Sequence, residues 1–311
     1  MITSSRQLKD KVRNLASEKE IDPQVLLRIY MMERLLERIS VSEYREKLIL
    51  KGGMLVSSLV GTAMRSTMDT DMTIRGVTVS TDAVRNMVEA IISVPLPDGV
   101  SFSIKSVSSI MDEAEYPGIR VSMNAFMEGV RVPLKLDFST GDVITPCAVE
   151  YPYKLMFEDR AVNLLSYNLE TVLAEKLETV IARTTANTRM RDFYDIYILS
   201  SIYRQRINPN LLADALEATS RQRGSLGLMA NAEKVLADLH ESKDILTLWE
   251  NYKSKFQYAE NISWNKVLRA VRQTAISAGL QVKKPSLLET IHEPLPEKRE
   301  APLRPKRDVE R

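Results

Sequence analysis

The sequence predicts an α+β protein in which a mixed-sheet half is followed by a helical half. Three observations support this class: helical spacing of apolar residues in the first 45 residues, alternating polar and apolar residues over about 48–156, and helical spacing again over about 160–280. With 311 residues the chain is long enough for two domains. The domain boundaries predicted from these changes are 1–158, 159–282 and 283–311.

The composition excludes several classes of protein. The 43 basic and 41 acidic residues nearly cancel, which argues against a protein that coats nucleic acid. One cysteine, Cys147, excludes an internal disulfide framework, and His240 and His292 are too far apart in sequence to suggest a histidine metal site. The sequence shows no signal-peptide pattern and no long apolar run, so we expect a cytoplasmic protein with no membrane partner.

Two helices are expected first, over 5–20 and 23–39, with Asp22-Pro23 as the N-cap and first residue of the second helix. A short strand from 48 then leads through two glycines into a helix that ends near Gly61. The segment 68–74 alternates, with one face formed by Met68, Thr70, Met72 and Ile74 and the other by Asp69, Asp71 and Thr73.

A helix over 82–94 and three strands are expected next, at 101–108, 119–127 and 130–138, the last two joined by a Glu128-Gly129 turn. On the third of these strands the polar face carries Pro133, Lys135 and Asp137, and the apolar face carries Val132, Leu134, Leu136 and Phe138. After a short segment at 151–156, helical periodicity predicts helices at 169–183, 191–204, 209–219, 231–240 and 243–256. The proline-rich tail from 283 is expected to be flexible or extended.

The acids of the alternating segment suggest a metal site. Asp69 and Asp71 face the same way on one strand, and two carboxylates that close together repel each other unless a divalent cation such as Mg²⁺ neutralises them. Asp137 adds a third acid on the polar face of another predicted strand. Three such acids can hold two metal ions around a phosphoryl group, with the third placed as a base for an attacking hydroxyl. The alternative is a solvated strand face.

A glycine pair precedes these acids. Lys51-Gly52-Gly53 lies between an apolar strand and a helix, where backbone N–H groups and the helix N-terminus can face an anion. A glycine pair alone is more often an ordinary turn. The ordered combination of Gly52-Gly53, Arg65, the two clustered acids and Asp137 is more specific, and it indicates a site for the triphosphate of an NTP substrate.

Two segments resemble a known family. LKGGMLVSSLVGTAMRSTMDTDMTIRG resembles the first motif of the AbiEii/AbiGii-type nucleotidyltransferase toxins, whose fold is DNA polymerase β-like. LSYNLETVLAEKLETVIARTTANTRMRDFYDIYIL resembles the A-E-K-L … R-D-x-Y-D region of the same toxins. The two matches cover most of residues 48–200 in the right order. The resemblance implies that the sheet half is a polymerase β-like nucleotidyltransferase domain.

The resemblance also implies roles for individual residues. Asp69 and Asp71 would bind the metal ions, Mg²⁺ or Mn²⁺, with Asp137 as the third carboxylate. Lys176 would contact the triphosphate or stabilise charge on the leaving group, and Asp195 aligns best with a further acid that the family requires. The residues expected to bind the nucleotide are Lys51, Gly52, Gly53, Arg65 and Asp192.

Structural alternatives exist for the second segment. Asp192 could be a helix N-cap and Asp195 a favourable acid of the first turn. Lys176 could lie on a solvated helix face beside Glu175 and Glu178. The apolar and aromatic residues here are better explained as core than as a base-stacking surface; they are Phe193, Tyr194, Tyr197 and Ile198.

Basic residues concentrate in and after the second segment. Arg183, Arg189 and Arg191 are the expected RNA-binding residues, and Arg204, Arg206, Arg221 and Arg223 follow. In a chain of nearly neutral charge, a local basic cluster beside a nucleotide site suggests a polyanionic acceptor such as RNA. A solvated helical surface explains the same residues equally well.

The expected function is therefore that of a metal-dependent nucleotidyltransferase toxin of a type IV toxin–antitoxin or phage-defence system. It would transfer NMP from an NTP to RNA, with the tRNA 3′ acceptor end favoured, and so block translation. Its partner would be a separate cognate antitoxin. The alternatives are nucleotide transfer to a protein hydroxyl, including self-modification, and a non-catalytic module that binds nucleotide or RNA.

Overall fold

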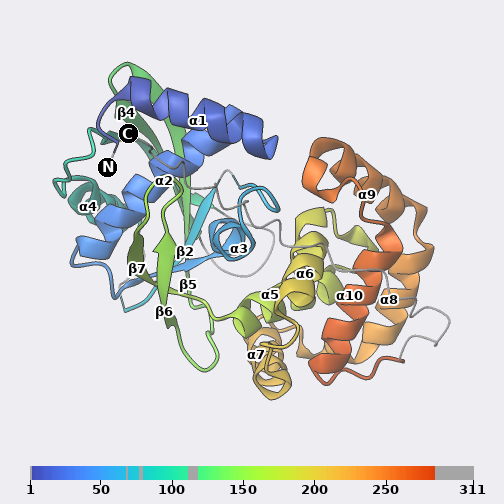
Figure 1. Cartoon of the computed structure of the whole chain (residues 1–311). Coiled ribbons are helices and arrows are strands. Elements are labelled where there is room, and N and C mark those ends of the chain that lie inside the picture. Colours follow the sequence, from blue (N-terminus) through green and yellow to red (C-terminus); the bar gives the residue numbers. More distant parts are fainter. Residues whose placement is uncertain (1, 68, 77–79, 111–117, 284–311) are drawn as a thin grey trace, which may run out of the picture.

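A seven-stranded mixed sheet, in the order β3-β4-β5-β2-β1-β7-β6, forms the first half of the molecule. The computed structural model describes residues 2–67, 69–76, 80–110 and 118–283. Figure 1 shows the sheet half beside a group of helices from the later part of the chain, so the predicted α+β class is confirmed. The strands are β1 (Leu48–Lys51), β2 (Thr70–Ile74), β3 (Ser101–Ile110), β4 (Gly118–Met127), β5 (Val130–Thr140), β6 (Val149–Lys154) and β7 (Ala161–Ser166).

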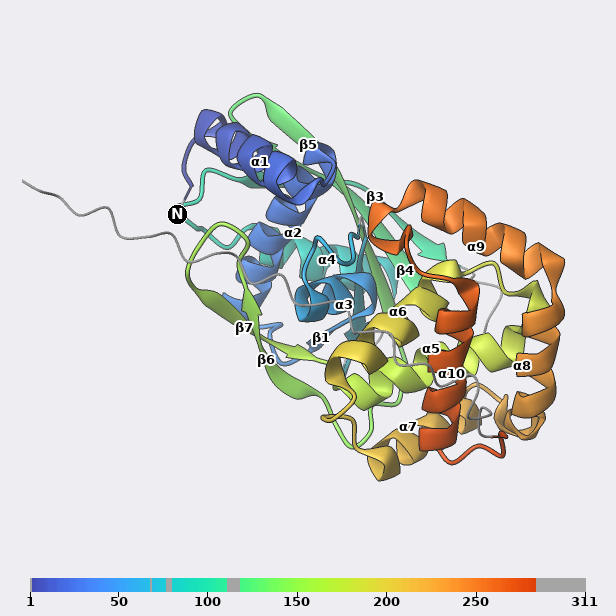
Figure 2. The same cartoon turned by 45° about the vertical axis from the view of Figure 1, so that its right-hand side comes forward.

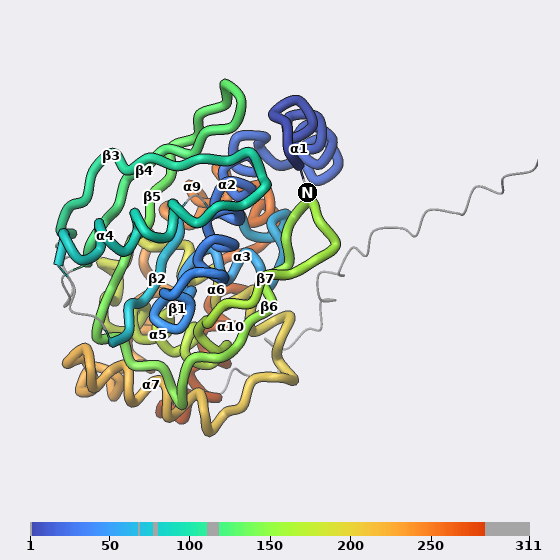
Figure 3. The backbone as a smooth tube through the Cα atoms, turned by 90° about the vertical axis from the view of Figure 1, so that its left-hand side faces the viewer, coloured from blue at the N-terminus to red at the C-terminus, as the bar shows by residue number. Residues whose placement is uncertain are grey.

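The helices of the sheet half begin where the sequence supplies caps. The Asp22 side chain accepts a hydrogen bond from the backbone N–H of Gln24, and Pro23 opens the helix, as predicted. Figure 3 views this half with the helical half behind it. The helices are α1 (Ser5–Lys19), α2 (Pro23–Val41), α3 (Gly52–Val60) and α4 (Thr81–Ile92), and α2 packs on the sheet beneath α1.

The register of the central strands brings the predicted acids together. β2 lies between β1, to which it is antiparallel, and β5, to which it is parallel. Asp71 is directly opposite Lys51 on one side and Asp137 on the other. On β5 the predicted apolar face is buried. The carboxylates of Asp71 and Asp137 therefore lie on the same polar face, at one end of the sheet.

β7 differs from the sequence prediction, in which the chain from about 160 is helical. It pairs in parallel with β1, through Ile49 opposite Leu165, and antiparallel with β6. The sheet therefore extends to Ser166, beyond residue 158, where the sequence suggests that the first domain ends. Only two residues separate β7 from the first helix of the helical half.

Figure 2 shows the helices of the helical half gathered beside the sheet half. They pack around a core of apolar and aromatic side chains. Phe193, Tyr194 and Ile198 are buried, which confirms them as core residues. The helix at the end of this half was not among those predicted, and it packs on α6. The helices are α5 (Leu169–Arg183), α6 (Met190–Tyr203), α7 (Pro209–Gln222), α8 (Ala232–Glu241), α9 (Lys243–Lys255) and α10 (Trp264–Ser277), with short 3₁₀ turns η1 (Thr184–Ala186), η2 (Leu226–Asn231) and η3 (Gln257–Ala259).

A group of charged side chains is buried where α2 meets the loop between β6 and β7. The Glu33 carboxylate accepts the backbone N–H of Met156 at 3.0 and 3.2 Å. Arg34 pairs with Glu37 and with Glu158, each at 3.0 Å. Burial raises the pKa of Glu33 to about 8, against the opposing effects of the Met156 N–H and Arg34.

Two sequence expectations are not tested by this structure. Nearly all of the tail predicted from 283, and Met68 in the alternating segment, lie outside the described residues. Within the described ranges, no helix combines the length and apolar composition needed to cross a bilayer.

Candidate functional site

The glycine pair lies at the N-terminus of α3, directly against the acid strand. Gly52 has a φ of +62°, and a Cβ there would lie 2.1 Å from Oδ2 of Asp71. A Cβ on Gly53 would lie 2.5 Å from Oγ1 of Thr67. The backbone N–H of Gly53 donates to Oδ2 of Asp71 at 3.3 Å. Only glycine at both positions allows this close approach, so the local backbone is built around the carboxylate.

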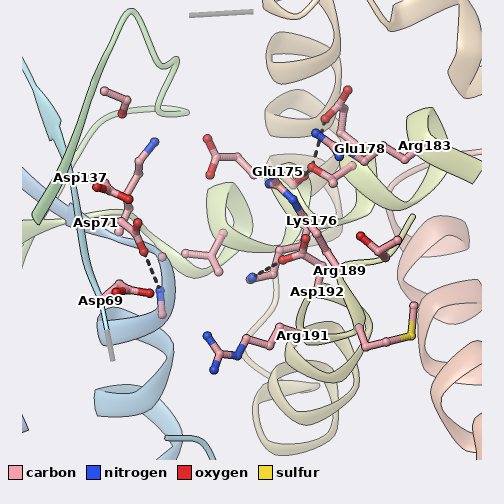
Figure 4. A pocket seen from close by; sticks show the side chains of 18 of the residues that line it. Asp69, Asp71, Asp137, Glu175, Lys176, Glu178, Arg183, Arg189, Arg191 and Asp192 are labelled. Atoms are coloured by element: carbon pink, nitrogen blue, oxygen red, sulfur yellow. Dashed lines mark hydrogen bonds and ion pairs between the residues drawn. The ribbon is translucent and has the colours of Figure 1, made fainter. Parts of the chain in front are cut away.

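Three acids gather on the sheet wall (Figure 4). Asp69 immediately precedes β2, Asp71 lies within it, and Asp137 is on β5. Burial raises the pKa of Asp71 above its ordinary value, Asp137 and Asp69 raise it further, and Lys51 and the Gly53 N–H oppose the rise. The cost of an ionised Asp71 among like charges is relieved by a cation. The carboxylates of Asp69 and Asp71 therefore fit a hard divalent ion whose other ligands are water and phosphate oxygens.

Asp137 has a partner that the sequence did not reveal. Arg120, on the neighbouring strand β4, donates to both of its carboxylate oxygens, at 2.7 and 2.6 Å. In the part of the chain that the structure describes, no three His, Cys, Asp or Glu side chains form a group that could hold a metal ion. Of the three acids on the sheet wall, Asp137 is thus bound by an arginine, which distinguishes it from Asp69 and Asp71 among the described residues.

Lys51 does not extend freely toward the cavity. Its Nζ pairs with Asp142 at 2.7 Å, and Asp142 also accepts hydrogen bonds from the hydroxyls of Thr73 and Ser139. Burial would lower the pKa of Lys51, but Glu175 and Asp142 raise it, so the side chain stays a cation. Asp142 was not predicted from the sequence, and it sets the position of this lysine.

The wall opposite the three acids is formed by α5 and α6, and a buried ion-pair network holds it in place. Arg65 donates to Asp195 through Nε at 3.0 Å and through Nη2 at 3.1 Å, and Nζ of Lys176 pairs with Asp195 at 2.7 Å and with Asp192 at 2.8 Å. Burial would raise the pKa of Asp195, but Arg65 and Lys176 lower it below its ordinary value. Asp195 is fully buried and does not line the cavity, so it acts by joining α5 and α6 to the sheet half.

These contacts decide between the alternatives left open by the sequence. Lys176 is not part of a solvated face, because its side chain is only 12% exposed and is bonded to two acids. Asp192 lies in the first turn of α6 but is not its N-cap, and Asp195 lies deeper in the helix. Glu175 and Glu178 pair instead with Arg223, at 3.2 and 2.6 Å.

The arginines of the basic cluster, which includes the three expected RNA-binding residues, lie in different surroundings. Arg183, Arg189 and Arg191 line the cavity, and Figure 4 shows Arg191 extending from α6 toward the wall that carries Asp69. Arg221 instead pairs with Glu217 on an exposed face of α7. Arg223 also lines the cavity and is bound to the two glutamates of α5.

One cavity of about 1010 Å³ joins the two walls. Every predicted site residue except Asp195 lines it: Lys51, Gly52, Gly53, Arg65, Asp69, Asp71, Asp137, Lys176, Arg183, Arg189, Arg191 and Asp192. Residues that the sequence did not single out complete it, among them Asp142, Tyr252, Lys255 and Phe256. The arrangement places acids and backbone N–H groups across from lysine and arginine, which suits a polyphosphate bound together with a cation.

Comparisons with known proteins give one family match and several similar structures. The family described as "Nucleotidyl transferase AbiEii toxin, Type IV TA system" matches residues 34–272. JHP933 from Helicobacter pylori is similar in structure with a TM-score of 0.45 and 14% identity, over 83% of this chain and 91% of that one. A candidate nucleotidyltransferase from H. pylori gives 0.46 and 14%, over 83% and 95%. An antigenic nucleotidyltransferase-like protein from Paracoccidioides brasiliensis gives 0.35 and 16%, over 78% and 100%. No curated protein matches the sequence.

Proposed function

Because the chain belongs to the AbiEii family of nucleotidyl transferase toxins of type IV toxin–antitoxin systems, we propose that it transfers a nucleoside monophosphate from an NTP to an RNA hydroxyl. The favoured hydroxyl is at the tRNA 3′ acceptor end, where an added nucleotide blocks aminoacylation and hence translation. The protein would act in the cytoplasm as a phage-defence toxin, neutralised by a separate cognate antitoxin.

The observation that carries this proposal is the cavity between the two walls. It brings the Asp69 and Asp71 carboxylates and the Gly52-Gly53 backbone to the same space as Lys176 on the opposite wall. These groups come from segments far apart in the chain, and nucleotidyl transfer from an NTP uses acidic and basic groups in this combination.

The residues of the chain would position the triphosphate and neutralise its charge. The N-terminus of α3 would face phosphate oxygens with backbone N–H groups and a favourable helix dipole. Asp192 and Asp195 raise the pKa of Lys176 despite its burial, so its ammonium group stays charged beside the pyrophosphate that leaves. Arg65 lines the same space from the sheet half.

A divalent cation, Mg²⁺ or Mn²⁺, held by Asp69 and Asp71 would neutralise phosphate charge when bound. The hydroxyl oxygen forms a bond to the α-phosphorus and releases its proton to solvent. The bond to the β-phosphate oxygen breaks, and pyrophosphate leaves with the electron pair. Most of the rate would come from positioning and charge stabilisation rather than from covalent catalysis by a side chain.

The proposal is tested by incubating the purified chain with total tRNA, Mg²⁺ and each α-labelled NTP in turn. Asp69→Ala is the variant expected to lose transfer, and Asp10→Ala is the control because its carboxylate is exposed on α1 and lies outside the cavity. Label on tRNA from wild type and Asp10→Ala, but not from Asp69→Ala, is the expected result.

Two other outcomes would change the conclusion. Label on protein alone would assign the acceptor to a side-chain hydroxyl, including one on the toxin itself. Absence of label on either acceptor, together with toxicity that survives Asp69→Ala, would leave a module that binds nucleotide or RNA without turnover.

A further inference from the structure

The helical wall of the cavity ends in a set of aromatic and cationic side chains that the transfer chemistry does not use. Phe256 caps the C-terminus of α9, where its backbone N–H bonds to the carbonyls of Tyr252 at 3.1 Å and Lys253 at 3.3 Å. The Phe256 ring is only partly buried and lines the cavity beside exposed Lys255.

The ring of Phe256 is held in one orientation by its neighbours. It stacks on Tyr258 with ring centres 5.3 Å apart and an angle of 24° between the planes. Tyr252 packs against it at 4.7 Å, and the hydroxyls of the two tyrosines are 2.9 Å apart. A ring fixed in this way loses little side-chain freedom when a ligand stacks over it.

Arg191 extends this stack into the cavity. Its guanidinium lies over the Phe256 ring, 5.3 Å from the ring centre, and Figure 4 shows the side chain reaching from α6 toward the opposite wall. Phe256 thus contacts both Tyr258 and Arg191, and Arg191 and Phe256 both line the cavity. Nucleobases stack on guanidinium planes as well as on aromatic rings, and both are used to hold unpaired bases of single strands.

We propose that Arg191, backed by Phe256, stacks against the 3′-terminal base of the single-stranded RNA acceptor. This inference rests on the proposed function, and it assigns the site of the acceptor base. The phosphates of the NTP are already provided for at the glycine segment and Lys176. Lys255 and Arg189 line the same cavity, and their positive charges suit the backbone phosphates of a strand that extends past the terminal base.

Two substitutions separate stacking from simple charge attraction. Arg191→Lys keeps the charge but removes the planar group, and Phe256→Leu keeps an apolar side chain but removes the ring. Arg206→Lys is the matched control, because Arg206 also lies over an aromatic ring, that of Tyr203 at 5.4 Å, but outside the cavity.

The experiment measures the Kd of a labelled single-stranded RNA without NTP, by fluorescence anisotropy, and the KM for NTP in the transfer assay. We expect Arg191→Lys and Phe256→Leu each to weaken RNA binding by about tenfold, the scale of one lost stacked base. Arg206→Lys should match wild type, and the KM for NTP should stay the same in all variants. Melting temperatures of the variants, measured in parallel, separate a lost contact from a lost fold.

Wild-type RNA affinity in Arg191→Lys would overturn the proposal, since charge alone would then suffice. A rise in the KM for NTP with unchanged RNA affinity would also overturn it and would assign the stack to the incoming nucleotide. If the wild type binds RNA through these residues but transfers no nucleotide, the proposed function fails while the stacking site stands. If it transfers nucleotide and the variants behave as wild type, the stacking site alone fails.

Discussion

Arg65 and Asp195 lie 130 residues apart in the chain and form an ion pair with two hydrogen bonds, at 3.0 and 3.1 Å. Arg65 is 3% exposed and Asp195 is 0% exposed. Arg65 lies just before the acid strand, and Asp195 lies on α6. The pair therefore ties the segment before β2 in the sheet half to the helices that carry Lys176, and Lys176 shares the same carboxylate.

Asp195→Asn should destabilise the protein strongly, because two buried cations would lose their common counter-charge. Removal of one partner from a buried ion pair costs about 3–5 kcal/mol, and urea unfolding measures this loss directly. Asp192→Asn is the control, since among the described residues the Asp192 carboxylate pairs with Lys176 alone and is partly exposed, and the loss of stability should be about 1 kcal/mol. Equal losses in the two variants would contradict a structural role for Asp195.

Gly52→Ala should lower the free energy of unfolding by more than backbone strain alone would. A left-handed φ in a non-glycine residue costs about 1–2 kcal/mol, and overpacking adds about 1–3 kcal/mol where a new Cβ meets Asp71. Gly129→Ala carries the same kind of strain at φ +79°, but its Cβ would enter open space. Chemical unfolding and transfer assays should show a larger stability loss, and loss of activity, for Gly52→Ala only. Similar behaviour of both variants would mean that strain, and not contact with the carboxylate, sets the requirement.

Asp71→Asn should abolish transfer but raise the melting temperature in the presence of a chelator. The substitution removes one of three neighbouring negative charges from a half-buried position, and a gain of 1 kcal/mol corresponds to a rise of about 2–4 °C. Added Mn²⁺ should narrow the difference, because a bound ion stabilises only the wild type. If the variant melts below wild type in chelator, the attraction of Asp71 to Lys51 and to the Gly53 N–H outweighs its repulsion by Asp69 and Asp137.

Glu33 should make stability depend on pH in a defined window. The folded protein keeps this proton up to about pH 8, whereas an unfolded chain releases it near the ordinary pKa of 4.5. Unfolding therefore releases a proton between these values, and the free energy of unfolding falls as the pH rises through them. The melting temperature of Glu33→Gln should match that of wild type near pH 4.5 and exceed it at pH 8.5. Melting curves recorded at both pH values measure the difference.

Glu18→Gln serves as the comparison for this pH dependence. Glu18 is an exposed carboxylate on α1 that pairs with its neighbour Lys19. This substitution should leave the change in melting temperature between pH 4.5 and pH 8.5 the same as in wild type. A Glu33→Gln protein with the wild-type pH dependence would refute a proton held by Glu33.

Much of the sheet could be predicted because each strand carries its own alternation. The burial of Leu134 and Leu136 on β5 follows from side chains that alternate between faces, and the same alternation placed Asp137 on the polar face. That Asp137 lies directly opposite Asp71 depended on strand order and register, which the structure supplies. The roles of these acids in metal binding and catalysis remain predictions.

The rest depends on partners that are distant in sequence. β7 is short and apolar, runs into a helix, and pairs with β1 more than a hundred residues earlier, so no local pattern separates it from a buried helix turn. Arg120 becomes the clamp of Asp137 only through the β4–β5 register. Likewise, Asp195 appears in sequence as an acid near a helix start, and its true surroundings come from Arg65 in the other half.

The short connection between β7 and α5 joins the two halves of the molecule directly beside the cavity. β1 leads directly into the glycine segment, and its neighbour β7 leads within two residues into the helix that carries Lys176. The two walls of the cavity thus extend from adjacent strands of the sheet. Because the connection is so short, we expect any relative motion of the two halves to be smaller at this end of the cavity than at the end lined by α9.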